Sequence, residues 1–189
     1  MKKMFTAVAL ATSISVPALA APETYAVEGT HTYPRFEYNH LGYSNQVQRF
    51  TKTTGKVVWD RAAKTGEIEI SIDATSVDTG YALFNQHIQG EDYFDTAKYP
   101  TITYKSTAVK FDGDKPVSIE GNLTIKGVTR PVTLAVTSFQ AMPHPMLKKD
   151  AIGANATAKI KRSEFNAGKN APYVSDEVTL TIAVEAIKQ

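Results

Sequence analysis

The sequence of 189 residues contains no cysteine. This absence excludes thiol nucleophiles, cysteine-ligated zinc, iron–sulfur clusters, covalently attached c-type haem and disulfides. The fold must therefore be held together by its own hydrophobic core, and a chain of this length can bury one.

The sequence also has little excess charge of either sign. It carries 21 Lys and Arg residues against 19 Asp and Glu residues, a formal net charge of +2. Lys2 and Lys3 belong to the N-terminal segment described below, and without them 21 − 2 = 19 basic residues face 19 acidic residues. Nucleic-acid surfaces need a strong basic patch, so we expect no nucleic-acid partner.

Residues 1–20 have the pattern of a cleaved secretory signal peptide. Lys2 and Lys3 form a positive start, residues 4–16 are mostly apolar, and Ala18, Leu19 and Ala20 match an A-x-A cleavage site. The apolar stretch is shorter than the roughly 20 residues that span a bilayer. We predict a cleaved leader over residues 1–20, one mature domain over residues 21–189, and a periplasmic location.

Motifs of common hydrolases and nucleotide-binding proteins are absent. The sequence has no G-x-S-x-G, no H-E-x-x-H and no glycine-rich phosphate loop. Its four histidines, His31, His40, His87 and His144, are scattered along the chain, and no two of them lie three or four residues apart. We therefore expect no metal site, no required cofactor and no enzymatic activity.

Alternation of apolar and polar residues dominates the rest of the chain. In residues 67–73, for example, three isoleucines fall on one face and acidic or serine residues on the other. This period is typical of antiparallel strands with one buried face. Turn signals such as Lys126-Gly127 separate such segments. The pattern predicts strands at about 25–40, 46–60, 65–76, 100–110, 114–126, 128–140, 152–164 and 174–187.

One stretch, residues 79–95, breaks the alternation. It places Leu83, Phe84, His87 and Ile88 at helical spacing before Gly90, which predicts a short helix.

The fold class expected from these elements is all-β. About eight long strands close into an antiparallel, lipocalin-like β-barrel, with the short helical insert at one mouth. A barrel of this size has an interior that can hold one small ligand. The periodicity fits equally well with a barrel filled by its own side chains, and both interpretations stay open on the pattern alone.

The candidate ligand-binding residues are apolar or aromatic side chains expected to face the interior, together with one histidine. They are Phe36, Tyr38, Ile68, Ile70, Ile72, Leu83, Phe84, His87, Ile88, Phe94, Ile102, Tyr104, Leu123, Ile125, Leu134, Val136 and Leu180.

A second candidate lies in a proline-containing segment. Met142, His144 and Met146 alternate there, and thioether with imidazole is a ligand set that suits Cu(I). The alternative is a hairpin loop stiffened by Pro143 and Pro145. We take the loop as the main interpretation and copper handling as the alternative function.

Four sequence blocks resemble the YceI family of exported, lipocalin-like, polyisoprenoid-binding proteins. The most specific is LTIKGVTRPV, residues 123–132. The others are residues 25–32 with Phe36 and 40–42; residues 77–80 through His87 and Ile88 to 93–95 and 98–100; and residues 160–165 followed by 176–178.

The resemblance implies an eight-stranded barrel whose elongated apolar pocket holds or transports an isoprenoid lipid, such as the tail of a polyprenyl quinone like ubiquinone. It also implies a non-catalytic protein that makes transient contact with a membrane or with membrane redox proteins. A homodimer is left open. So is the alternative of an enzyme or stress-response factor that acts on such a lipid through His87 and nearby acids.

Overall fold

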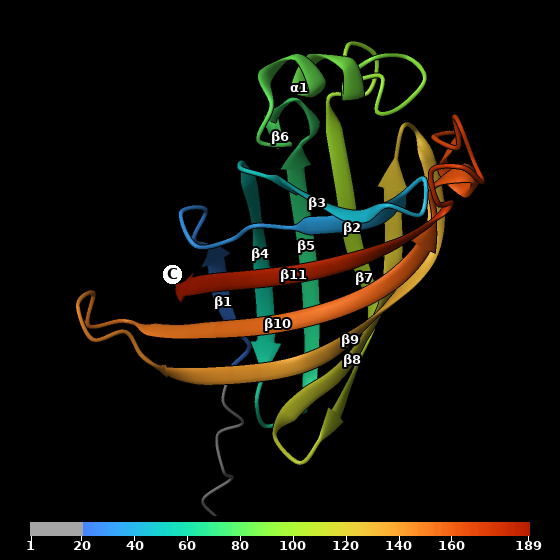
Figure 1. Cartoon of the computed structure of the whole chain (residues 1–189). Coiled ribbons are helices and arrows are strands. Elements are labelled where there is room, and N and C mark those ends of the chain that lie inside the picture. The colour runs from blue at the N-terminus through green and yellow to red at the C-terminus, as the bar shows by residue number, and fades with distance from the viewer. Residues whose placement is uncertain (1–20) are drawn as a thin grey trace, which may run out of the picture.

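The computed structural model describes residues 21–189, and the predicted leader over residues 1–20 lies outside the described residues. The described residues form eleven strands, one short α-helix, α1 (Ala82–Ile88), and two 3₁₀ turns, η1 (Ala74–Ser76) and η2 (Arg162–Phe165). Figure 1 shows their arrangement. The strands are β1 (Glu23–Val27), β2 (Arg35–His40), β3 (Ser44–Phe50), β4 (Thr53–Asp60), β5 (Thr65–Asp73), β6 (Val77–Asp78), β7 (Thr101–Asp112), β8 (Lys115–Ile125), β9 (Val128–Pro143), β10 (Asp150–Lys161) and β11 (Glu177–Lys188).

Eight of these strands form a closed antiparallel barrel. They follow the order β1-β4-β5-β7-β8-β9-β10-β11, and β11 pairs back onto β1. The short strands β2, β3 and β6 continue from β11 as a branch beside the barrel. The predicted all-β antiparallel barrel with one short helix is therefore confirmed.

The first two predicted strands are each interrupted, which corrects the expected ranges. The predicted strand 25–40 is split into β1 and β2 by residues 28–34, where Pro34 has no backbone N–H to give to a ladder. The predicted strand 46–60 is split into β3 and β4 at residues 51 and 52. Their backbone N–H groups donate to Ser76 instead of to a neighbouring strand.

The other predicted strands are present with shifted ends. Predicted strand 65–76 stops at residue 73 because the Asp73 side chain accepts a hydrogen bond from the backbone N–H of Thr75 and begins η1. The end of predicted strand 152–164 is taken by η2. The turn between β8 and β9 forms at Lys126 and Gly127, whose φ angles of 51° and 72° are those of a type I′ hairpin.

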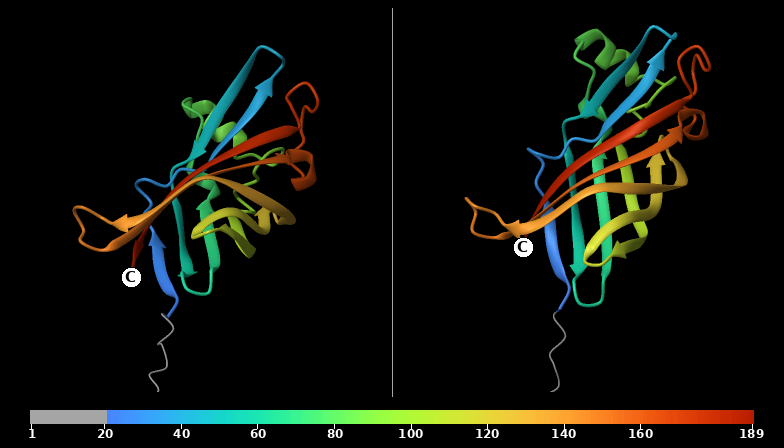
Figure 2. Two further views of the ribbon diagram at one scale, coloured as in Figure 1. Left: turned by 90° about the horizontal axis from the view of Figure 1, so that it is seen from below. Right: turned by 60° about the horizontal axis from the view of Figure 1, so that its bottom comes forward.

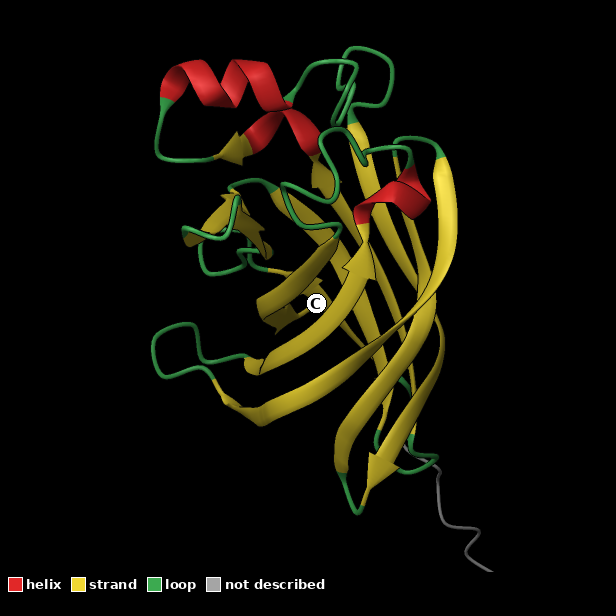
Figure 3. Ribbon diagram, turned by 45° about the vertical axis from the view of Figure 1, so that its right-hand side comes forward, coloured by secondary structure: helices red, strands yellow, loops and turns green. Residues whose placement is uncertain are grey.

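The elements at the two ends of the barrel differ (Figure 2). Helix α1, the β2–β3 turn and residues 162–176 gather at one end, which we call the helix end. The β4–β5 turn and the β7–β8 turn form the opposite end, which we call the far end. Figure 3 shows the helical segments confined to the helix end and the strands forming the wall. Within residues 21–189, no helix is long and apolar enough to cross a membrane.

Candidate functional site

The interior of the barrel contains a cavity of about 570 Å³. Side chains from the barrel strands, the β2–β3 branch and α1 line it, and the wall is overwhelmingly apolar. The alternation seen in the sequence explains this wall, because every second side chain of a barrel strand points inward.

All but one of the candidate ligand-binding residues line this cavity. Those that do are Phe36, Tyr38, Ile68, Ile70, Ile72, Phe84, His87, Ile88, Phe94, Ile102, Tyr104, Leu123, Ile125, Leu134, Val136 and Leu180. That any of them contacts a ligand remains a prediction.

The exception is Leu83, which was wrongly expected to face the interior. Its side chain is 61% exposed and lies outside the cavity wall. On α1, Phe84, His87 and Ile88 share the inward face, and Leu83 is rotated roughly 100° from its neighbour Phe84 about the helix axis. An apolar residue beside the buried stripe of a short helix is easily mistaken for part of it.

Several polar groups of the cavity wall lie at the helix end. The His87 ring lies between Phe84 and Tyr93, with ring centroids 6.0 and 5.1 Å away. The Tyr93 hydroxyl accepts a hydrogen bond from Asn170 Nδ2 at 3.4 Å. Lys169 lines the same region.

Arg162 builds the rim of the cavity at the helix end. Its guanidinium donates to four backbone carbonyls at 2.6–2.8 Å, those of Ala167, Lys169, Val174 and Ser175. Burial lowers the pKa of the Arg162 guanidinium from its usual value. The side chain therefore holds residues 166–175 in a compact loop against the cavity mouth.

Sequence reasoning missed several of these polar wall residues. Tyr93 and Arg162 stand in blocks that carry the family resemblance, and that was the only signal that pointed to them. Lys169 and Asn170 come from a loop with no periodic pattern. Only the folded chain brings them beside the helix.

The far end of the cavity is closed by aromatic side chains. Trp59, Phe111 and Phe139 line it, and the Trp59 and Phe139 rings meet edge to face with centroids 5.3 Å apart. Tyr104 lies across the middle of the wall, and its hydroxyl is 3.0 Å from the carbonyl oxygen of Ile119. Burial raises the pKa of Tyr104 to about 12, so this phenol stays neutral at ordinary pH.

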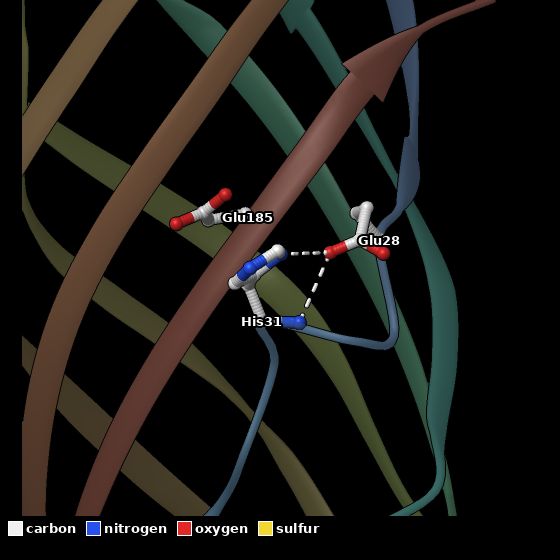
Figure 4. A group of neighbouring side chains, drawn as sticks. All are labelled: Glu28, His31 and Glu185. Atoms are coloured by element: carbon white, nitrogen blue, oxygen red, sulfur yellow. Dashed lines mark hydrogen bonds and ion pairs between the residues drawn. The ribbon is translucent and has the colours of Figure 1, made fainter.

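The histidines do not converge on a shared site. Figure 4 shows His31 directed at Glu28, with Nδ1 2.7 Å from Oε2, and Glu185 beside them on β11. Ligand atoms of these three residues lie within 4.8 Å of one another. However, the Glu28 carboxylate already accepts hydrogen bonds from the backbone N–H groups of Thr30 and His31, so the turn accounts for the cluster.

The methionine-containing segment projects from the barrel as the β9–β10 hairpin. Met142 and Met146 are exposed there. The His144 Nδ1 atom accepts hydrogen bonds from the backbone N–H groups of Met146 and Leu147, both at 3.2 Å. This ring nitrogen therefore stabilises the turn, and copper binding by the segment stays a prediction.

Comparison with known proteins assigns the family. The model of the YceI-like domain matches residues 25–186. The chain belongs to the YceI family. Protein YceI of Escherichia coli O157:H7 is 38% identical over 173 residues, which cover 91% of this chain and 90% of that protein. Protein YceI of Salmonella arizonae is 34% identical over the full length of both chains.

Solved structures of similar proteins share the barrel. BcnA of Burkholderia cenocepacia matches with a TM-score of 0.72 and 28% identity, over 85% of this chain and 99% of that chain. A polyisoprenoid-binding domain from Saccharophagus degradans matches with a TM-score of 0.67 over 87% of this chain and 98% of that chain. At 17% identity, this structural match shows a common fold alone. The YceI family resemblance drawn from the four sequence blocks is thus confirmed.

Proposed function

We propose that this protein binds an isoprenoid lipid in the barrel cavity and carries it through the periplasm without chemical change. The cargo we favour is a polyprenyl quinone such as ubiquinone. The observation that supports this most directly is the site itself, an apolar interior of about 570 Å³ with His87, Lys169 and Asn170 in its wall at the helix end. The Saccharophagus degradans neighbour, described as a polyisoprenoid-binding domain, agrees with it.

The physical chemistry of such a cargo fits this arrangement. A polyprenyl tail offers no hydrogen bonds, and leaving it in water costs about 0.8 kcal/mol for each exposed CH₂ group. For a tail of about 40 carbons, roughly 0.3 kcal/mol per heavy atom corresponds to about 12 kcal/mol and nanomolar binding. A carrier therefore needs only a dry, long wall and a few polar groups for the head.

The test is native mass spectrometry of residues 21–189, isolated from a periplasm and followed by lipid extraction. We expect a stoichiometric isoprenoid. Ile70→Asp and Leu134→Asp each place a charge on the cavity wall and should abolish retention. Ala135→Asp, on the exposed face of the same strand, is the matched control and should retain the lipid. An empty protein that also fails to take up added polyprenyl quinone would contradict the proposal.

Transfer of the lipid requires a place to meet the membrane, and we place this contact at the helix end. Exposed apolar and aromatic side chains surround the cavity mouth there, and Tyr43 and Tyr173 are 87% and 76% exposed. The backbone N–H of Leu41 donates to the carbonyl of Tyr173, which joins the β2–β3 turn to the loop that Arg162 holds. Tyrosine suits the membrane interface because it has an apolar ring and a polar tip.

The contact is tested by the rate of quinone transfer between two vesicle populations. Tyr43→Ser combined with Leu83→Ser should slow transfer several-fold and leave equilibrium affinity unchanged. Val117→Ser, an exposed apolar residue of β8 near the far end, is the control and should transfer at the wild-type rate. Equal rates for all three proteins would move the membrane contact elsewhere.

A further inference from the structure

The aromatic layer at the far end borders two hollows. Trp59, Phe111 and Phe139 line the barrel cavity, and the same three residues also line a second hollow of about 520 Å³. The second hollow is bordered by the turns of the far end and is more polar. Its other lining residues are Arg61, Ala62, Lys64, Asp114, Lys115, Gln140 and Ala141.

Trp59 is held in this layer from outside the cavity. The Arg61 guanidinium lies over its ring, 4.4 Å from the centroid. Arg61 is itself fixed, because Nε lies 3.2 Å from a Glu23 carboxylate oxygen and Nη2 donates to the Tyr25 hydroxyl at 3.0 Å. Tyr25 is fully buried and donates to Glu23 at 2.6 Å. The indole is therefore a braced wall of the cavity.

The wall of the cavity beside Trp59 is apolar. The cross-strand partner of Trp59 on β5 is Gly66, which also lines the cavity, and a Cβ built on Gly66 would lie 3.5 Å from the Val109 side chain. The cavity is thus bounded by aromatic surfaces at the far end, whereas His87, Lys169 and Asn170 line it at the helix end. A ligand with one polar head and one apolar tail has a single favourable direction in it.

We propose that the Trp59, Phe111 and Phe139 layer sets the maximum length of the tail that the barrel accepts, with the tail tip against Trp59 and the head at the helix end. This inference rests on the proposed function, since it concerns how the same cavity selects among isoprenoid lipids. A tail that is too long must leave carbons in water at the mouth or break the braced layer.

The direction of binding can be read from the wild-type protein. Trp59 is the single tryptophan of the chain, so intrinsic fluorescence reports the far end alone. A polyprenyl alcohol brominated at its tail tip should quench this emission strongly, and the same alcohol brominated beside its head should not. Stronger quenching by the head-labelled probe would reverse the direction and overturn the proposal.

The length limit is tested with a ladder of polyprenyl alcohols that differ by one isoprene unit, competed for one protein and read by native mass spectrometry. The wild-type protein should show a sharp upper limit of polyprenyl chain length. Its affinity should fall roughly tenfold or more for the first alcohol that exceeds this length. Trp59→Ala joins the two hollows and should move the limit to longer chains. Phe139→Ala removes a ring of the same layer from β9, and it replaces Trp59→Ala in this test if that variant does not fold.

Tyr81→Ala is the control, because it removes an exposed aromatic ring beside α1 at the helix end that does not line the cavity. It should leave the length limit where it is in wild type. An unchanged limit in both far-end variants, with wild type still binding isoprenoids, would overturn the length inference and leave the carrier function standing. A wild type that binds no chain of any length would instead contradict the carrier function itself.

Discussion

Two buried threonines of the cavity wall differ in the hydrogen bonding of their side-chain hydroxyl groups. Thr32 and Thr53 are 1% and 4% exposed, and both line the cavity. The Thr32 hydroxyl donates to the Glu28 carbonyl at 2.8 Å and accepts from the Glu185 backbone N–H at 3.1 Å. The Thr53 hydroxyl is the buried side-chain group without a hydrogen-bond partner within residues 21–189. The same side chain is therefore satisfied at one position and not at the other.

Replacing each threonine by valine should have opposite effects on stability. Thr53→Val exchanges an unpaired hydroxyl for a methyl group of the same shape and should raise the free energy of unfolding by about 1 kcal/mol. Thr32→Val leaves the Glu185 backbone N–H without its acceptor and should lower the free energy of unfolding by about 1–3 kcal/mol. Urea unfolding of both variants measures this. Equal losses in the two proteins would show that the Thr53 hydroxyl has a partner after all.

The turn at residues 28–31 is sensitive to pH through two groups. The hydrogen bond from the Thr30 side chain is the largest cause that lowers the pKa of Glu28, to about 2, and His31 adds to it. The hydrogen bond with Glu28 in turn raises the pKa of His31. The lowered pKa stabilises the fold above the ordinary value of 4.5 and is lost as pH falls toward 2. The raised pKa stabilises it below the ordinary value of 6.5 and is lost as pH rises through the folded-state value.

Glu28→Gln should therefore cost most stability in the window where both groups are charged. We expect the difference in Tm from wild type to be largest between about pH 5 and 6 and to shrink at alkaline pH, where His31 is neutral. In the variant, NMR titration should show the pKa of His31 falling from its wild-type value. An unchanged His31 titration would mean that the contact with Glu28 does not form in solution.

At the scale of elements, the strands were predictable and their interruptions were not. The alternation over residues 67–73 or 178–185 predicts one inward and one outward face, and these two faces are sufficient to identify a barrel strand. The break at residues 28–34 depends on side-chain capping by Glu28 and on pairing with distant β11, which local periodicity does not contain. Leu83 was misplaced because a helix of seven residues, about two turns, is too short to define its buried stripe.

Strand β8 contains a glycine, Gly121, at a position that has no room for a Cβ atom. A Cβ added to Gly121 would lie 2.5 Å from the Tyr104 ring and 2.7 Å from the backbone oxygen of Lys105. Gly121→Ala should thus lower the free energy of unfolding by about 1–3 kcal/mol through overpacking. Gly153→Ala on β10 is the control, since its new Cβ would meet nothing closer than 3.8 Å. It should be neutral or stabilising by about 0.4–1 kcal/mol in chemical denaturation. Equal losses in the two variants would mean that β8 can shift away from Tyr104.

At the scale of the whole molecule, the barrel shape and the wall of the cavity were predictable, but the polar rim was not. Inward-facing positions follow from each strand separately, so all the candidate wall residues on strands line the cavity. The rim needs Tyr93, Arg162 and Asn170, which come from segments far apart in sequence and meet only after the barrel closes. A function that depends on both the apolar wall and the polar rim can therefore be inferred only from the folded structure together with the alternation pattern.

The closed barrel should also depend on its cargo for part of its stability. β1 and β11 close the ring through three residue pairs, and the interior beside them contains the cavity. A ligand that binds only the folded chain adds about 2.7 kcal/mol at a hundredfold excess over its Kd, which corresponds to a Tm increase of roughly 5–10 °C for a domain of this size. We expect calorimetry of lipid-stripped residues 21–189 to show this increase when polyprenyl quinone is added. Leu134→Asp, with a charge in the cavity wall, should show none. An equal increase in both proteins would place the stabilising lipid on the outer surface instead of inside the barrel.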